Sequence, residues 1–186
     1  QGDYCPRCGA LLEPIKAEKE KPMASEELIP QKQHFEVILD NIRSAYNVGA
    51  IFRIADGAGI KHLYLCGITP NPKGHPAIGK TALGAEDEVP WSYHPNALDV
   101  AHTLREKGYH LLALERRSES ILLPNFSTEF LNGQPLGLIL GNERAGVDPG
   151  LIGLCDTVIA LPMVGKKASL NVAVAFGIAA YWLSFR

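Results

Sequence analysis

With 186 residues, of which 46% are hydrophobic and 20% charged, the chain has the composition of a globular protein that can bury a sizeable core. No stretch approaches the ~20 apolar residues of a membrane span, and the first residues lack the basic segment and apolar core of a secretion signal. We therefore expect a cytoplasmic protein without membrane contact. The formal net charge of −2 excludes attraction of nucleic acid by overall charge, although a local basic surface would suffice for binding.

The start of the chain differs in composition from the rest. Residues 13–33 are rich in Lys, Glu and Pro and poor in large apolar side chains, which is typical of a solvated linker. We therefore predict an N-terminal extension over residues 1–33 and a folded domain over residues 34–186. The chain begins with Gln rather than Met, and whether further residues precede it stays open.

The extension contains Cys5 and Cys8 in a Cys-Pro-Arg-Cys-Gly turn. Such a turn opens a zinc ribbon, in which the two thiolates occupy adjacent corners of a tetrahedron. A ribbon needs a second pair, whereas Cys66 and Cys155 are isolated in apolar sequence, where we expect core residues. Three interpretations remain: a zinc half-site that a missing segment or second subunit completes, a redox pair, and a remnant. The redox pair is disfavoured because no βαβ pattern surrounds the turn.

From His34 onward, short β-prone apolar runs alternate with helical patterns. The runs predict buried strands over residues 35–39, 62–66, 110–114, 136–140 and 157–161. Amphipathic patterns predict helices over residues 48–58 and 97–107. Strands that alternate with helices indicate an α/β fold, with a parallel sheet flanked by helices.

The last predicted helix, residues 170–185, contains no charged side chain and is apolar on nearly every side. A helix of this kind is buried all round. At the end of a small domain the expected cover is a second subunit, so we predict a homodimer that forms through this helix. The alternative is burial within one chain.

The usual glycine-rich nucleotide motifs are absent. No Gly-x-Gly-x-x-Gly follows the first predicted strand, and no P-loop pattern occurs, which disfavours a conventional Rossmann or P-loop enzyme. Instead, three clusters of polar and glycine residues follow predicted strands, at the positions where open α/β sheets bind their ligands. These clusters contain Asn47 and Arg53, then Gly141 and Glu143, and finally Ser169 and Asn171.

Several of these residues have a structural interpretation beside the functional one. Asn47 and Ser169 are both placed to cap the helix that follows. Arg53 is either an ion-pair partner or a group that binds an anion, and Glu143 either accepts hydrogen bonds from a ligand or pairs with a neighbouring base. Asn171 has no propensity reason to occupy the first turn of an apolar helix, which favours a functional role.

The three clusters together resemble the SpoU or TrmH branch of the SPOUT methyltransferases, from Phe35 to the end of the chain. Asn47 and Arg53 match the first motif of that family. Gly141 and Glu143 match its second motif, and the third is matched by Leu161-Pro162-Met163 with Ser169-Leu170-Asn171.

The resemblance implies a SPOUT-type fold with a C-terminal deep trefoil knot, a homodimer, and transfer of a methyl group from S-adenosylmethionine to a ribose 2′-hydroxyl of tRNA or rRNA. It further implies that backbone groups of Gly141, Leu161 and Leu170 hold the cofactor, with a further contact near Leu114 or Glu115. In similar enzymes the residue that matches Arg53 activates the ribose hydroxyl. The remaining motif residues arrange the substrate and the active-site loops, namely Asn47, Glu143, Ser169 and Asn171.

Alternatives remain for the mechanism and for the function. Arg53 is either a base perturbed by an RNA phosphate or an electrostatic clamp, because a guanidinium group normally stays protonated. A non-catalytic RNA-binding or assembly protein on the same fold is the main alternative function. A second alternative keeps the cofactor but methylates a base atom, because a fold alone does not fix function.

Overall fold

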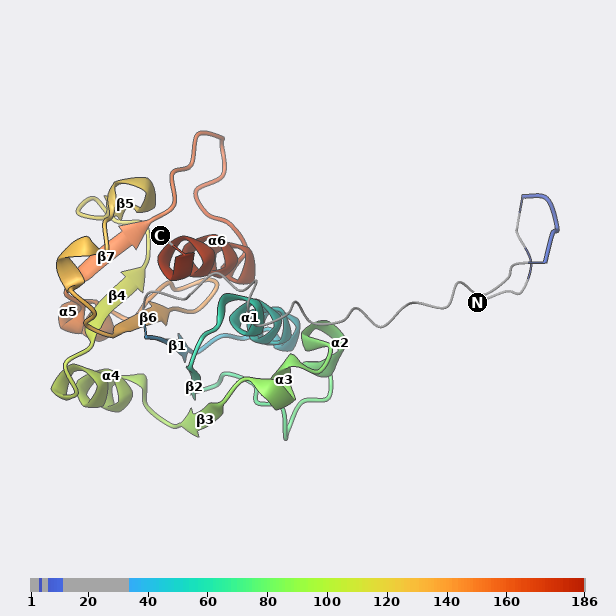
Figure 1. Cartoon of the computed structure of the whole chain (residues 1–186), viewed down its shortest axis with the longest axis horizontal. Coiled ribbons are helices and arrows are strands. Elements are labelled where there is room, and N and C mark those ends of the chain that lie inside the picture. The colour runs from blue at the N-terminus through green and yellow to red at the C-terminus, as the bar shows by residue number, and fades with distance from the viewer. Residues whose placement is uncertain (1–3, 5–6, 12–33, 186) are drawn as a thin grey trace.

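A parallel sheet forms the centre of the molecule in the computed structural model, which describes residues 4, 7–11 and 34–185. In the described part of the chain this sheet has seven strands in the order β3-β2-β1-β6-β4-β7-β5, and all neighbouring strands pair in parallel. Helices cover both of its faces (Figure 1). The predicted α/β architecture is therefore confirmed. The strands are β1 (Phe35–Asp40), β2 (His62–Cys66), β3 (Trp91–His94), β4 (His110–Leu114), β5 (Ile121–Leu122), β6 (Leu136–Leu140) and β7 (Thr157–Ala160).

The central strands are buried because helices pack on both sides of them. Every residue of β1 and of β6 is buried, which explains why these strands are continuous apolar runs rather than alternating ones. The five predicted strands occur within one residue of their expected ends. Sequence patterns missed the edge strands β3 and β5, because β3 is a four-residue segment with no aliphatic side chain and β5 has only two residues, both exposed.

Two apolar layers separate the sheet from its helices. On one face lie α1 (Ala45–Ala58), α2 (Gly79–Ala82), α3 (Ala85–Glu88) and α6 (Val172–Phe185), whose core includes Phe52 and Phe176. On the other face lie α4 (Ala97–Glu106) and α5 (Pro149–Leu154), where Leu104 and Leu151 are buried. Two 3-10 turns, η2 (Leu123–Asn125) and η3 (Glu129–Leu131), connect β5 to β6.

Two helices begin at residues other than those predicted. Helix α1 begins three residues earlier than expected, and the hydroxyl of Ser44 caps it by accepting the backbone N–H of Asn47. The expected capping role of Asn47 is therefore wrong. In α6 the side-chain oxygen of Asn171 accepts the N–H groups of Ala173 and Val174, so Asn171 rather than Ser169 has the capping contacts.

The uncharged helix α6 is not buried all round by its own chain. It packs against α1, but Val174, Ile178 and Tyr181 are 52%, 45% and 50% exposed. Their spacing places them on one outward face of the helix. Burial within one chain is therefore wrong for this face.

The described cysteines and helices test the predictions about core thiols and membrane spans. Cys66 is fully buried, and burial raises its pKa to about 12, as expected for a core thiol. Cys155 packs against the same apolar layer. Cys8 is exposed, and Cys5 lies outside the described residues. Among the residues that the structure describes, the helices are too short or too polar for a membrane span.

Candidate cofactor cavity and active site

A cavity of about 390 Å³ lies at the carboxyl edge of the sheet. The ends of β4, β6 and β7 and the segments that follow them enclose it, together with the first residues of α6. In Figure 1 the segment between β7 and α6 projects from the body of the molecule. The volume of the cavity is within the range of pockets that bind nucleotide-sized ligands. All predicted cofactor residues line it, namely Leu114, Gly141, Leu161 and Leu170.

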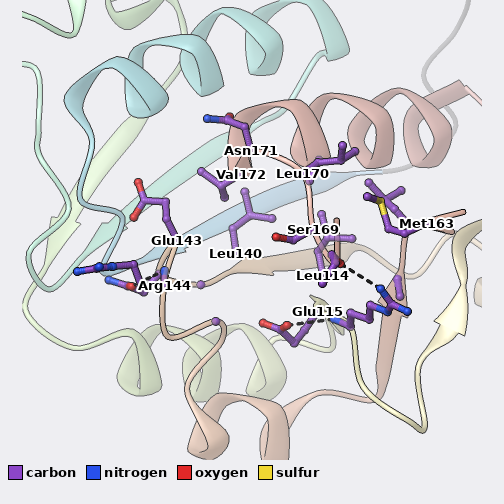
Figure 2. A pocket seen from close by; sticks show the side chains of 18 of the residues that line it. Leu114, Glu115, Leu140, Glu143, Arg144, Met163, Ser169, Leu170, Asn171 and Val172 are labelled. Carbon is purple, nitrogen blue, oxygen red and sulfur yellow. Dashed lines mark hydrogen bonds between the residues drawn. The ribbon is translucent and has the colours of Figure 1, made fainter. Parts of the chain in front are cut away.

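Aliphatic side chains form one wall of the cavity. Leu114, Leu140 and Leu170 come from three different parts of the chain and lie around the same space in Figure 2. Gly141 leaves β6 at a point where a β-carbon would overlap the backbone of Gly146 and Val147, so only glycine allows this close approach. The wall therefore fits a flat apolar group, such as a nucleobase.

Three side chains from the three sequence clusters form a hydrogen-bonded network at the cavity. The amide of Asn171 donates to the side-chain oxygen of Asn47 at 3.0 Å, and the amide of Asn47 donates to Glu143 at 2.9 Å. All three residues line the cavity. We call them the Glu143–Asn47–Asn171 network. It joins the starts of α1 and α6 to the loop after β6.

Glu143 is the centre of a larger set of contacts. Besides Asn47, its carboxylate accepts the backbone N–H groups of Arg43 at 2.9 Å and Ser44 at 3.1 Å. Partial burial alone would raise the pKa of this carboxyl, but the hydrogen bonds outweigh it and hold the pKa below its ordinary value. Glu143 is therefore ionised at neutral pH, and it orients the loop before α1 instead of pairing with a neighbouring base.

The structure brings most of the predicted site residues together, but not Arg53. Ser169 lines the cavity beside the network residues. Arg53 is exposed on α1 and does not line the cavity, and its side chain makes no hydrogen bond or ion pair with another described residue. It lies about 1.7 helical turns beyond Asn47 and therefore on a different side of the helix. Its guanidinium group is free to meet an anion.

Two charged residues, Glu115 and Arg116, line the cavity after β4, where the resemblance implied a contact near Leu114 or Glu115. Glu115 follows Leu114 directly, and its carboxylate accepts the N–H groups of Arg116 at 3.0 Å and Val147 at 2.9 Å. The guanidinium group of Arg116 donates to the carbonyl of Ala168 at 3.2 Å. No distinct motif marks Glu115 and Arg116 in the sequence, and only their position at the end of a predicted strand pointed to the site.

The predicted metal half-site cannot be assembled from the described residues. They contain no group of three His, Cys, Asp or Glu side chains that could hold a metal ion. One of the two proposed ligands, Cys5, lies outside them.

Known proteins resemble this chain in sequence and in fold. The model of the SpoU rRNA Methylase family matches residues 34–181. The tRNA (guanosine(18)-2′-O)-methyltransferase of Aquifex aeolicus is 29% identical over 178 residues, which cover 92% of this chain and 78% of that protein. The 23S rRNA (guanosine-2′-O-)-methyltransferase RlmB of Ralstonia nicotianae is 29% identical over 76% of this chain and 55% of its own length. The chain thus spans little more than half the length of several such relatives.

Solved structures agree with these matches. The TrmH/SpoU tRNA modifying enzyme of A. aeolicus superposes with a TM-score of 0.72 at 27% identity, covering 82% of this chain and 76% of that one. The SpoU methyltransferase AviRb of Streptomyces viridochromogenes, in complex with AdoMet, gives a TM-score of 0.69 at 27% identity, covering 83% and 61%. From the fold, the three clusters at one cavity and the family match over residues 34–181, we conclude that the chain belongs to the SpoU rRNA methylase family, with TrmH-type relatives.

Proposed function

We propose that the chain transfers a methyl group from S-adenosylmethionine to a ribose 2′-hydroxyl of tRNA or rRNA. The observation that carries this proposal is the Glu143–Asn47–Asn171 network, which unites all three sequence motifs beside one cavity. Relatives at 29% identity are named as guanosine-2′-O-methyltransferases of tRNA and of 23S rRNA. A cytoplasmic location accords with RNA substrates of these kinds.

The cavity fits the cofactor by size and by chemistry. The aliphatic wall of Leu114, Leu140 and Leu170 suits the adenine, and the backbone groups of Gly141, Leu161 and Leu170 at the cavity can supply polar contacts. When bound there, S-adenosylmethionine would supply an electrophilic methyl group on a sulfonium. The task of the protein is then to hold a ribose oxygen in line with that group, which can contribute several kcal/mol. We assign this positioning to Asn47, Asn171 and Ser169, with Glu143 holding the loop before α1.

Arg53 is proposed to activate the ribose hydroxyl through its charge. A guanidinium group normally stays protonated, so an electrostatic clamp on the developing oxyanion and the adjacent phosphate fits its chemistry better than proton abstraction. An RNA phosphate or water would then take the proton. The pH–rate profile of Arg53→Ala with RNA bound separates the two: a lower rate with the same pH dependence as the wild type would support the clamp, and loss of a pH-dependent step would support the base. A variant that methylates at the wild-type rate would contradict both.

We propose that the protein forms a homodimer through the outward face of α6, and that Arg53 serves the cavity of the partner subunit. The support is the apolar face of Val174, Ile178 and Tyr181, which lies beside the α1 segment that contains Arg53. A β-carbon on Gly57, one turn after Arg53, would approach the Tyr181 hydroxyl to 2.7 Å. Arg53 therefore borders the proposed interface rather than its own cavity.

Mixed dimers test this assignment. Arg53→Ala removes the guanidinium group, and Leu170→Trp fills the cavity. Each variant alone should be inactive, whereas a one-to-one mixture should recover about a quarter of wild-type activity, because half of the dimers are then mixed and each mixed dimer has one complete site. A mixture that stays inactive after confirmed subunit exchange would place Arg53 at the cavity of its own chain.

The deep trefoil knot is also part of the proposal. Its support is the strand order β1-β6-β4-β7 together with the packing of α6, which follows β7, against α1, because β4 and β6 lie between β7 and β1. The two loops that would form the crossing both line the cavity.

For the N-terminal part we propose an extension over residues 1–33 in which Cys5 and Cys8 form a zinc half-site. Metal analysis of the purified chain tests it, and the absence of stoichiometric zinc would remove the half-site.

Methyl transfer is tested by incubating the protein with methyl-labelled S-adenosylmethionine and total tRNA or rRNA. We expect label in RNA with the wild type and none with Leu170→Trp. RNA binding without incorporation of label would favour the non-catalytic RNA-binding protein.

A further inference from the structure

We infer that a groove beside the edge strand β3 binds an unpaired nucleotide of the RNA, outside the nucleotide that is methylated. This inference rests on the proposed function, because it takes RNA as the substrate. The groove has a volume of about 490 Å³, and the residues that line it are Asn71, Lys73, Trp91, Ser92 and Tyr93. None of them lines the cofactor cavity. Strand β3 forms the edge of the sheet opposite to β5 and lies three strand spacings, or about 14 Å, from β6 (Figure 1).

Two aromatic side chains form one side of the groove. Trp91 and Tyr93 are alternate residues of β3, so they lie on the same face of the strand, about 7 Å apart along it. Trp91 packs partly against the apolar layer that contains Phe52, and Tyr93 is 50% exposed. The hydroxyl of Tyr93 donates to the carbonyl of Gly67 at 3.1 Å, which fixes the end of its ring. Rings that are held in place but not covered provide a platform on which nucleobases stack.

A lysine lies beside this aromatic platform. The Nζ atom of Lys73 is 5.9 Å from the centre of the Trp91 ring, at the outer limit of a cation–π contact. Lys73 is exposed and forms no ion pair with another described residue. Its long, flexible side chain can therefore move to the phosphate of a nucleotide whose base stacks on the ring. The described residues that line the groove include no acidic one, and the acidic side chains of α3 lie outside it.

The chemistry of the groove favours an unpaired nucleotide over a peptide. The outer edge of β3 is unpaired in the described part of the chain, so addition of a peptide strand is the alternative. With four residues, however, β3 offers few main-chain hydrogen bonds to a peptide. The side-chain oxygen of Asn71 accepts the N–H of Gly74 at 3.1 Å, which leaves its amide nitrogen as a donor at the groove. Aromatic rings, a lysine and an amide match the base, the phosphate and the base edge of a nucleotide.

Tryptophan fluorescence tests the stacking directly. The chain has two tryptophans, Trp91 and Trp182, so a Trp182→Phe background leaves Trp91 as the only one. Total tRNA and total rRNA are titrated separately, and binding is measured in parallel by filter retention. We expect the RNA that binds more tightly to quench the fluorescence of Trp91 with the same midpoint as binding. Binding without any change in this fluorescence would overturn the inference.

Substitutions in the groove measure what the platform contributes to RNA affinity. Trp91→Ala should weaken binding between roughly fivefold and a hundredfold, whereas Trp91→Phe keeps an aromatic face and should lose much less. Lys73→Ala should weaken binding and reduce its dependence on salt concentration. Phe130→Ala is the matched control, because Phe130 is 56% exposed but belongs to η3, which follows the opposite edge strand β5.

Two further readouts separate RNA recognition from a merely structural role. The groove variants should keep the Tm and the S-adenosylhomocysteine affinity of the wild type, because the groove is remote from the cavity. If Trp91→Ala lowers these values together with RNA affinity, and Trp91→Phe does the same, the role is structural and the inference fails. Wild-type RNA affinity in Trp91→Ala also overturns it and leaves the peptide as the occupant. A wild type that neither binds RNA nor methylates it contradicts the proposed function itself, which is a distinct result.

Discussion

Asn171 has two structural roles that a single substitution can separate. Its oxygen caps α6, and its amide donates to Asn47. Asn171→Asp keeps the cap but loses the donor, so we expect near wild-type thermal stability and a rate of methyl transfer reduced between roughly tenfold and a hundredfold. Asn171→Ala should also lose about 1 kcal/mol of stability, which lowers Tm by about 2–4 °C. Equal rates for Asn171→Asp and wild type would show that the network does not position substrate.

Glu143 should make the stability of the site depend on pH. Its pKa is held below the ordinary value of 4.5, so its contribution is fully present above 4.5 and is lost as the pH falls through the lower pKa of the folded state. The Tm difference between wild type and Glu143→Gln should therefore be largest near neutral pH and vanish in acid. A difference that stays constant down to acid pH would show that the carboxylate charge does not matter.

At the residue scale, the sequence predicted which residues lie close together, but not the hydrogen bonds between them. The positions of Asn47, Glu143 and Asn171 after predicted strands placed them at one edge of the sheet. Their mutual hydrogen bonds join residues about a hundred positions apart and depend on tertiary geometry. The roles of Ser44 and Asn171 as caps were missed, because several residues with capping side chains precede each helix.

At the element scale, the outward face of α6 is the feature that a single chain does not explain. We expect Ile178→Arg to convert the dimer to a monomer, because a desolvated charge at the centre of an apolar interface is unfavourable. Light scattering after size-exclusion chromatography gives the mass. The matched control is Leu83→Arg, since Leu83 is also an exposed apolar residue but lies at the end of α2, away from this face. A wild-type chain that is already monomeric would refute the interface.

Strands were easier to predict than the short helices. Long apolar runs identify β1, β2, β4 and β6 because both faces of these strands lie against the core. Helices α2 and α3 have four residues each, too few to show a periodicity. Helix α5 was missed although Asp148-Pro149 is a recognisable start, with the Asp side chain capping and Pro in the first turn.

At the scale of the whole molecule, the described core is built from residues 35–183 alone. Removal of residues 1–33 should therefore leave the Tm and the affinity for S-adenosylhomocysteine unchanged within error. A lower Tm would show that the extension packs on the domain. If only the binding of RNA becomes weaker, the extension contacts the RNA substrate. Circular dichroism melts and calorimetry provide both values.

The proposed methylation of a ribose oxygen of RNA is tested most directly by mass spectrometry of nucleosides from tRNA and rRNA after reaction with methyl-labelled S-adenosylmethionine. We expect labelled 2′-O-methylnucleosides with the wild type and their loss with Arg53→Ala. Label on a base would contradict the proposed acceptor, and no label in any RNA would contradict the proposed reaction.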